Sequence, residues 1–263
     1  MAIVGKVESL WRYPVKSMRG EELQEAFLSF AGVYGDRLFA FKGAARPKGF
    51  PYLTGREQSR MLLYRPHFRH PERAAKPPNW AEAEDIAPGL NPISAHPADL
   101  AVDVETPSGE VLPVDNPVLI RKLGEGLGKP EGLTLLRSER AMTDCRPVSL
   151  FAIQTAHRLG EELGLNLDKR RFRANIFMDL PSTAGFAEDE FIGRTLRIGS
   201  KVMVSVLERD PRCAMITIDP DTAARNTAIL GNVTKAHDGK AGVYAAVLVE
   251  GVVRVGDDIE TVS

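Results

Sequence analysis

Cys213 is the residue in this chain best suited to chemistry, because it ends the kinked segment Asp210-Pro211-Arg212-Cys213 directly after an alternating apolar stretch. The proline fixes its own backbone, and we expect the neighbouring Arg212 guanidinium to favour the thiolate electrostatically. A thiolate on a rigid turn is either a soft metal ligand or a nucleophile. The competing interpretation is a small buried hydrophobic residue, since free cysteine is among the most buried residue types. The segment by itself leaves these interpretations open.

Arg173 and Asn175 form a second polar group, in the stretch Phe172-Arg173-Ala174-Asn175-Ile176. On a strand, the two polar side chains would point to one face and the apolar side chains to the other. The polar pair could then point into a pocket while the opposite face packs on the core. We therefore predict a strand over residues 172–178 that presents Arg173 and Asn175 to a site.

Thr155 opens the clearest helical pattern, which covers residues 155–163. Ala156, Leu159 and Leu163 share one face, and Gly164 is suited to end the helix. Because the first backbone amides of a helix have no partner within it, they favour an anion. Thr155 is therefore a candidate binding residue, and a simple N-cap is the equal alternative.

Other residues that could bind a metal or a nucleotide show weaker patterns. Cys145 lies in Asp144-Cys145-Arg146-Pro147 and is predicted to be a spare buried thiol. The five histidines show no zinc signature. The stretch Gly124-Glu-Gly-Leu-Gly128 lacks both the Rossmann and the Walker spacing, so we predict a flexible turn there.

The elements that position these residues are expected to be mainly strands. We predict strands at residues 4–13, 23–30, 37–41, 100–105, 110–114, 195–198 and 202–207. A hairpin is expected between residues 243–249 and 252–255, around Glu250-Gly251. Strands thus dominate, with a few helices and no regular alternation of strand and helix. This mixed α/β but strand-dominated pattern favours a closed or half-closed β-barrel with helical decoration over a doubly wound sheet.

The chain is expected to divide into two halves, residues 1–114 and 115–263, because Asp115-Asn116-Pro117 marks a break. Residues 66–97 contain seven prolines and no sustained apolar period. We interpret this stretch as an insertion on the surface, with a lid as the less favoured alternative.

The overall composition limits the classes of partner. Lys and Arg number 34 against 35 Asp and Glu, which gives a formal net charge of −1 and argues against general binding of nucleic acid. No apolar run approaches the roughly 20 residues of a membrane span. Two cysteines fit a reducing compartment rather than a disulfide framework. We therefore expect a soluble cytoplasmic protein with no membrane partner.

Five separated stretches resemble the MOSC family, which is named after the C-terminal domain of molybdenum cofactor sulfurase. They are Tyr13-Pro-Val-Lys-Ser17, Gly35-Asp-Arg37, Arg171-Phe-Arg-Ala-Asn-Ile176, Asp210-Pro-Arg-Cys213 and Gly242-Val-Tyr244 with Arg254-Val-Gly-Asp257. They occur in the family's order and span nearly the whole chain. The chain looks most like the members with an additional N-terminal β-barrel half, such as the mitochondrial amidoxime-reducing components and the bacterial YcbX-type proteins. The resemblance thus implies a MOSC-type barrel plus an N-terminal β-barrel half.

The resemblance also implies a site for the molybdenum cofactor in its molybdopterin form. Cys213 would bind the metal beside the dithiolene of the pterin, and a soft thiolate suits such a metal. Basic and polar side chains of both halves would hold the cofactor and its phosphate, as guanidinium forks and lysine charges do. The residues that this assigns to the cofactor are Lys16, Ser17, Arg37, Thr155, Arg173, Asn175 and Arg212. A solvated lysine and an ion pair between Arg37 and Asp36 are the alternatives for two of them.

The function that the resemblance implies is an oxidoreductase that reduces N-hydroxylated, N-oxide or related small-molecule substrates. Two cysteines cannot supply the four ligands of an iron–sulfur cluster, so electrons are expected from a separate ferredoxin- or cytochrome-type partner. One alternative is a sulfur carrier, in which a persulfide on Cys213 serves metal–sulfur or cofactor assembly. Another is a non-catalytic protein that binds or delivers the cofactor.

Overall fold

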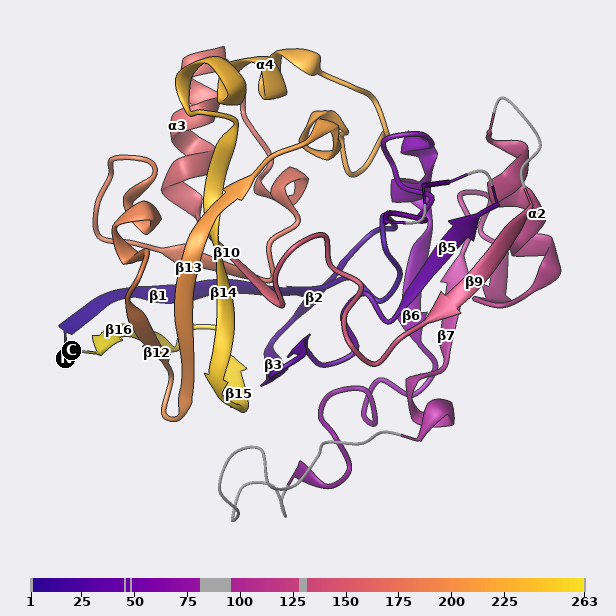
Figure 1. The fold of residues 1–263 in the computed structure, drawn as a ribbon, viewed down its shortest axis with the longest axis horizontal. Coiled ribbons are helices and arrows are strands. Elements are labelled where there is room, and N and C mark those ends of the chain that lie inside the picture. Colours follow the sequence, from indigo (N-terminus) through magenta and orange to yellow (C-terminus); the bar gives the residue numbers. More distant parts are fainter. Residues whose placement is uncertain (1, 45, 48, 81–95, 128–131, 263) are drawn as a thin grey trace.

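Seven strands close into a barrel, which lies on the left-hand side of the molecule in Figure 1. The structure is a computed structural model, and it describes residues 2–44, 46–47, 49–80, 96–127 and 132–262. Around the barrel the strands follow the order β11, β10, β14, β13, β12, β16 and β1, and β1 pairs back onto β11. Their bounds are β1 Ala2–Arg12, β10 Val148–Ala152, β11 Ile176–Asp179, β12 Thr195–Ile198, β13 Val202–Pro211, β14 Lys240–Val249 and β16 Asp258–Val262.

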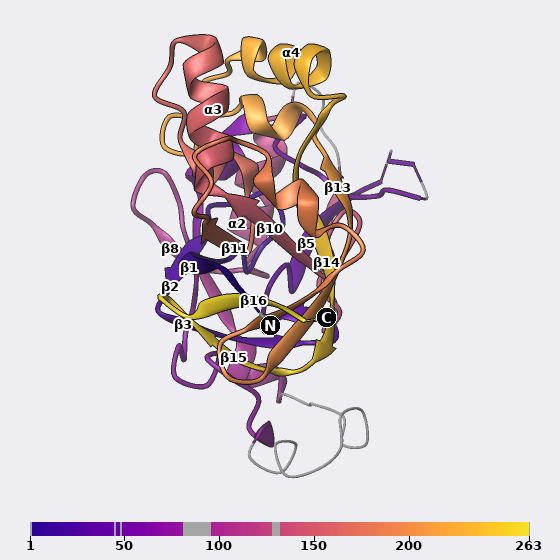
Figure 2. The ribbon, with the colours of Figure 1, turned by 90° about the vertical axis from the view of Figure 1, so that its left-hand side faces the viewer.

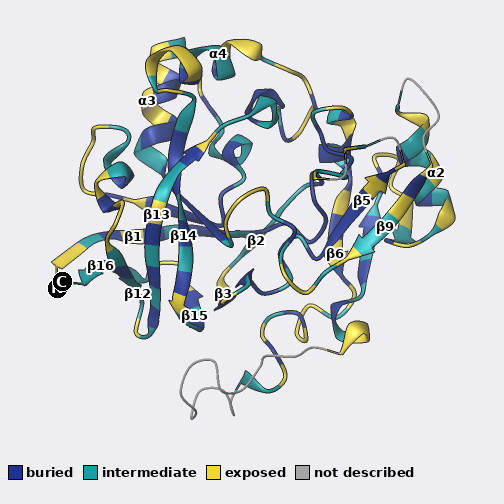
Figure 3. Cartoon of the chain, in the orientation of Figure 1, coloured by how far each residue is buried: buried dark blue, intermediate teal, exposed yellow. Residues whose placement is uncertain are grey.

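Alternating apolar residues fill the inside of the barrel. In β13, Val202, Val204 and Val206 are buried, and in the neighbouring β14 so are Val243 and Ala245. Successive residues of a strand point to opposite faces, so these side chains pack together inside. Figure 3 shows buried residues alternating with less buried ones along β13. The predicted strand-dominated fold with a closed barrel is confirmed.

Two strands of the N-terminal half pair with strands from the later part of the chain. β1 lies between β11 and β16, and the short β2 (Glu21–Leu23) extends it. β15 (Gly251–Arg254) pairs with β3 (Glu25–Ser29) rather than with β14, so the predicted hairpin of residues 243–249 with 252–255 is wrong. Gly251 already belongs to β15, which leaves Glu250 alone between the two strands. A hairpin needs a loop of at least two residues, so the chain crosses to the other sheet instead.

Three small sheets contain the remaining strands of the described residues. β3 also pairs with β4 (Gly32–Val33), and β5 (Phe39–Gly43) pairs with β9 (Leu133–Arg137). β6 (Arg65–Phe68), β7 (Val102–Glu105) and β8 (Val111–Pro113) form the third sheet, which contains the predicted hairpin around residues 106–109. The strand β6 occupies the start of the predicted insertion at residues 66–97, and residues 81–95 of that stretch lie outside the described residues.

Helices α3 (Ile153–Leu163) and α4 (Thr227–Ala236) lie together at one end of the barrel, in both views (Figures 1 and 2). α3 begins two residues before the predicted start and ends, as predicted, at Gly164, whose φ of 63° is left-handed. A further helix, α2 (Pro117–Glu125), was not predicted, although Asn116 caps it through Val118 N (2.8 Å) and Pro117 follows the cap. It includes Gly124, so the predicted flexible turn at residues 124–128 is wrong at its start. Among the described residues, no helix is both long and apolar enough to cross a membrane.

Candidate functional site

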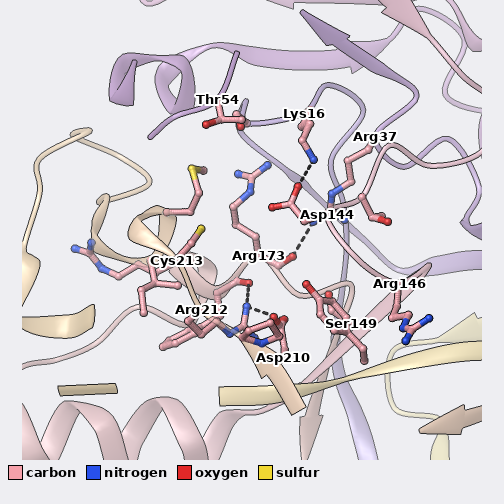
Figure 4. A pocket seen from close by; sticks show the side chains of 18 of the residues that line it. Lys16, Arg37, Thr54, Asp144, Arg146, Ser149, Arg173, Asp210, Arg212 and Cys213 are labelled. Carbon is pink, nitrogen blue, oxygen red and sulfur yellow. Dashed lines mark hydrogen bonds and ion pairs between the residues drawn. The ribbon is translucent and has the colours of Figure 1, made fainter. Parts of the chain in front are cut away.

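A cavity of about 750 Å³, open to solvent, lies where the barrel meets the N-terminal half (Figure 4). The N-terminal half contributes Lys16, Ser17, Arg37, Thr54 and Arg56. The barrel strands and the segments that adjoin them contribute the remaining residues, which include Asp144, Arg173, Asp210, Arg212 and Cys213. Among the described residues, seven arginine and lysine side chains line the cavity against two carboxylates. This excess of positive charge makes the cavity a place for an anion.

Cys213 lies at the wall of this cavity, two residues after the end of β13. Its backbone is extended, with φ −120° and ψ −178°, and it begins the short 3₁₀ helix η5 (Ala214–Thr217). The preceding backbone is fixed by the hydrogen bond from Arg212 N to Gly239 O (2.8 Å). The thiol is free and half-buried. Cys213 is therefore not the fully buried hydrophobic residue of the competing interpretation.

Arg212 is held firmly by groups around it. Its Nε donates to Ala241 O (2.6 Å), and its Nη1 donates to Phe172 O (2.9 Å) and pairs with Asp210 Oδ2 (2.9 Å). Burial raises the pKa of Asp210 to about 6, against the opposing charge of Arg212. Arg212 Nη2 is buried and has no hydrogen-bond partner among the described residues. One guanidinium nitrogen of a fixed fork is thus left for a ligand.

Arg173 is the least neutralised charge of the cavity. Its guanidinium carbon lies 4.2 Å from the centroid of the Tyr13 ring, and its buried Nη2 has no partner among the described residues. Burial lowers the pKa of Arg173 to about 10, and the neighbouring Arg37 charge acts in the same direction while Tyr13 opposes it. A buried guanidinium without a carboxylate is costly. An anion in the cavity would remove that cost.

The strand predicted for residues 172–178 begins only at Ile176. Before it, Asp168 caps the 3₁₀ helix η3 (Lys169–Phe172), and Arg173 takes a left-handed φ of 53°. Alternation of polar and apolar residues was therefore a misleading signal at this position. Arg173 and Asn175 nevertheless both line the cavity.

Arg37 also has a left-handed backbone, with φ 42°, in the turn before β5. It pairs with the buried carboxylate of Asp36, which also accepts from Tyr13 N (2.8 Å). Its Nη2 donates to Arg173 O (3.0 Å). The ion pair that we weighed as an alternative is thus present, and Arg37 still faces the cavity.

Lys16 and Ser17 lie in the loop after β1 and line the same cavity. Lys16 Nζ donates to Met142 O (2.8 Å) and to the carboxylate of Asp144, so it is not a solvated lysine. Burial lowers the pKa of Lys16, although the Asp144 charge opposes this. Ser17 is buried and has a left-handed φ of 64°.

Asn175 is 1% exposed, and its side chain joins two strands of the barrel wall. Its Oδ1 accepts from Ser149 N (3.2 Å), and its Nδ2 donates to Trp11 O (3.3 Å). Ser149 belongs to β10 and Trp11 to β1. The amide of Asn175 therefore holds the cavity wall together, whatever else it contacts.

Thr155 lies outside the cavity, in contrast to the prediction. Its Oγ1 donates to the buried carboxylate of Glu188 (2.8 Å) and accepts from Phe186 N (2.7 Å). The N-cap position of α3 is Ala152, so Thr155 is not a cap either. Because the helix begins two residues earlier than predicted, Thr155 faces the barrel end instead of a ligand.

Cys145 is exposed, so the prediction of a buried thiol is wrong. Its Sγ lies 3.9 Å from Glu208 Oε1, which also accepts from Arg146 Nε (2.7 Å). The neighbouring Asp144 and Arg146 line the cavity, and sequence reasoning missed both. Thr54 and Arg56 were also missed, and no local pattern marks them. Among the described residues, no group of three or more His, Cys, Asp or Glu side chains is arranged to hold a metal ion.

Comparisons with known proteins identify both halves of the chain. The sequence profile of the MOSC domain matches residues 137–260, and that of the MOSC N-terminal beta barrel domain matches residues 4–75. No curated protein sequence matches the chain.

Several solved structures are similar to the chain at low sequence identity. YuaD from Bacillus subtilis is 13% identical over 98% of this chain and 95% of its own length, with a TM-score of 0.47. YiiM from Geobacillus stearothermophilus is 21% identical over 45% of this chain and 55% of its own, with a TM-score of 0.34. YiiM from Escherichia coli is 18% identical over the same shares, with a TM-score of 0.34. On the two sequence profiles, the chain belongs to the MOSC family and has a MOSC N-terminal β-barrel domain before its MOSC domain.

Proposed function

We propose that the cavity binds the molybdenum cofactor and that the protein is a reductase of N-hydroxylated, N-oxide or related substrates. One observation carries the proposal. The half-buried thiol of Cys213 shares a cavity with two guanidinium groups, Arg173 and Arg212, that each keep a buried nitrogen without a partner. A site that leaves such donors unpaired and offers a thiol beside them fits a ligand with an anionic end and a soft metal end.

The donor set fits the phosphate of a pterin cofactor. Each unpaired buried nitrogen costs roughly 1–3 kcal/mol, which a phosphate oxygen would recover. Guanidinium groups bind phosphate with paired hydrogen bonds, and Lys16 adds a point charge. Lys16 is now held by Asp144, so the incoming anion would compete with that carboxylate. We assign the anion to Lys16, Arg37, Arg173 and Arg212.

Cys213 is the residue that we assign to the metal. Its thiolate would be a soft ligand for such a metal. When bound, the cofactor would supply the two-electron redox chemistry that removes an oxygen atom from the substrate. Two protons and two electrons balance the loss of that oxygen as water. A separate redox protein would provide the electrons, while the chain itself binds and orients the cofactor.

Turnover of an N-hydroxylated substrate tests this function. Cofactor-loaded protein with reduced methyl viologen as the electron donor should convert benzamidoxime to benzamidine. Cys213→Ser should abolish turnover, whereas Cys145→Ser should retain it, because Cys145 does not line the cavity.

Two results would contradict the reductase. The first is loaded protein that reduces neither N-oxygenated compounds nor sulfoxides. The second is cyanide-labile sulfur on Cys213 in protein that contains no molybdenum, which would support the sulfur carrier instead.

A further inference from the structure

A second cavity of about 480 Å³ adjoins the first and shares Arg173 with it. Its walls are mostly apolar: they include the side chains of Trp11, Tyr13, Leu62 and Pro220. Pockets for small molecules typically have apolar walls and a few placed polar groups. We propose that this second cavity binds a small aromatic carboxylate, whose ring lies against Trp11 and whose anionic end meets Arg19 and Arg173.

The two arginines provide the anionic end of the site. Arg19 Nη2 donates to Pro220 O (2.8 Å) and to Asp221, but its Nε is buried without a partner among the described residues. Arg173 Nη2 is unpaired in the same way. The third arginine of the cavity, Arg170, already pairs with Asp168 and Asp221. Two guanidinium groups that each keep one unpaired nitrogen, at the edge of an apolar space, match a carboxylate.

The apolar walls distinguish this ligand from the cofactor phosphate that we assign to the arginines of the first cavity. A phosphate has no apolar surface to place against an indole and a leucine side chain. A flat ring stacks on Trp11 with its face and is attracted by the nearby guanidinium groups. A cation is excluded, because Glu22 is the only carboxylate among the described lining residues, and its side chain is exposed. The combination therefore favours a monoanion with an aromatic body.

Trp11 provides the readout, because the chain has only one other tryptophan, Trp80. In a Trp80→Phe background, titration with benzoate should change the Trp11 fluorescence to saturation. Benzamide has the same shape without the charge and should bind at least tenfold more weakly. No saturable change with benzoate, or equal binding of benzamide, would overturn the proposal.

Variants locate the site. Arg19→Gln should weaken benzoate binding at least tenfold, and Leu62→Phe should weaken it by filling the cavity without a change in charge. The matched control is Arg254→Gln, which alters an exposed arginine paired with Glu25 and should bind as the parent does. Unchanged melting temperatures would show that the variants fold. Parent-like benzoate affinity in both Arg19→Gln and Leu62→Phe would contradict the site.

The shared Arg173 predicts coupling between the cavities. An anion in the first cavity neutralises Arg173, so saturating inorganic phosphate should weaken benzoate binding several-fold. Because the coupling is reciprocal, benzoate should weaken phosphate binding by the same factor. Arg173→Gln should remove this coupling. Benzoate affinity that is independent of phosphate in the parent would contradict the role of Arg173 in the second cavity.

Discussion

Single residues of the cavity carry charge that the folded chain does not neutralise, and Arg173 is the clearest case. Natural sites often give up stability for binding in this way. Arg173→Gln removes an unpaired buried charge, so its free energy of unfolding in urea should equal that of the parent or exceed it by up to about 1 kcal/mol. The same variant should bind inorganic phosphate about tenfold more weakly in calorimetry, because a charged donor is lost.

Arg171→Gln is the matched control for that trade-off. Arg171 lines the same cavity but donates to Thr217 O (3.1 Å) and Asp219 Oδ2 (2.7 Å). Its loss should cost about 1 kcal/mol of stability. Equal destabilisation by the two substitutions would contradict the view that Arg173 is kept for a ligand.

Glu188 predicts a pH dependence of stability. Burial raises the pKa of Glu188 to about 7, although hydrogen bonds from Thr155 and Ala152 N oppose this. The folded state therefore holds a proton that the unfolded state releases near its ordinary pKa, so this contribution to stability is lost as the pH rises toward 7 and beyond. The free energy of unfolding should fall by roughly 1–3 kcal/mol between pH 5 and pH 8 because of this group.

Urea unfolding at several pH values measures the effect. Glu188→Gln stays neutral, so its stability should depend less on pH than that of the parent. Glu190→Gln, at an exposed position of the same segment, should behave like the parent. If the parent and Glu188→Gln give parallel curves, Glu188 does not titrate in this range.

Among the secondary-structure elements, those with a strong period were predictable and those set by tertiary pairing were not. The strands at residues 195–198 and 202–207 and the helix ending at Gly164 follow directly from their apolar spacing. β15 pairs with β3 because only Glu250 separates it from β14, which is too short a loop for a hairpin. β11 begins late because Asp168 caps the 3₁₀ helix η3 before it. Neither is visible in a periodic pattern. Cys213 was a candidate from its segment and does line the cavity, whereas Thr155 does not, because the helix begins before the predicted residue.

Asn175 tests how the strands form the cavity wall. Asn175→Ala removes the amide that joins Ser149 of β10 to Trp11 of β1, and it leaves the buried Ser149 N without that acceptor. We expect a loss of about 2 kcal/mol in the free energy of unfolding, measured in urea. Asn232→Ala removes a surface amide that bonds Glu162 (2.7 Å) and should cost less than half as much. Equal losses would contradict a structural role for Asn175.

Across the whole molecule, the site exists only because the two halves meet. β1 is part of the barrel, and its following loop carries Lys16 and Ser17 to the end of β13, where Cys213 lies. These residues are nearly 200 positions apart in the chain, so no local pattern could show that they share a cavity. The ordered set of family motifs could show it, because each motif contributes at least one residue that lines the cavity. Thr54, Arg56 and Asp144 lie on loops between those motifs, which is why they were missed.

The metal content of the native protein tests the central claim most directly. Protein purified from cells that make the cofactor should contain stoichiometric molybdenum and pterin, measured by elemental analysis and pterin fluorescence. Cys213→Ser should lose the molybdenum while keeping the parent's melting temperature, and Cys145→Ser should keep both. Native protein without molybdenum and pterin, or a folded Cys213→Ser variant that retains the full metal content, would contradict the account.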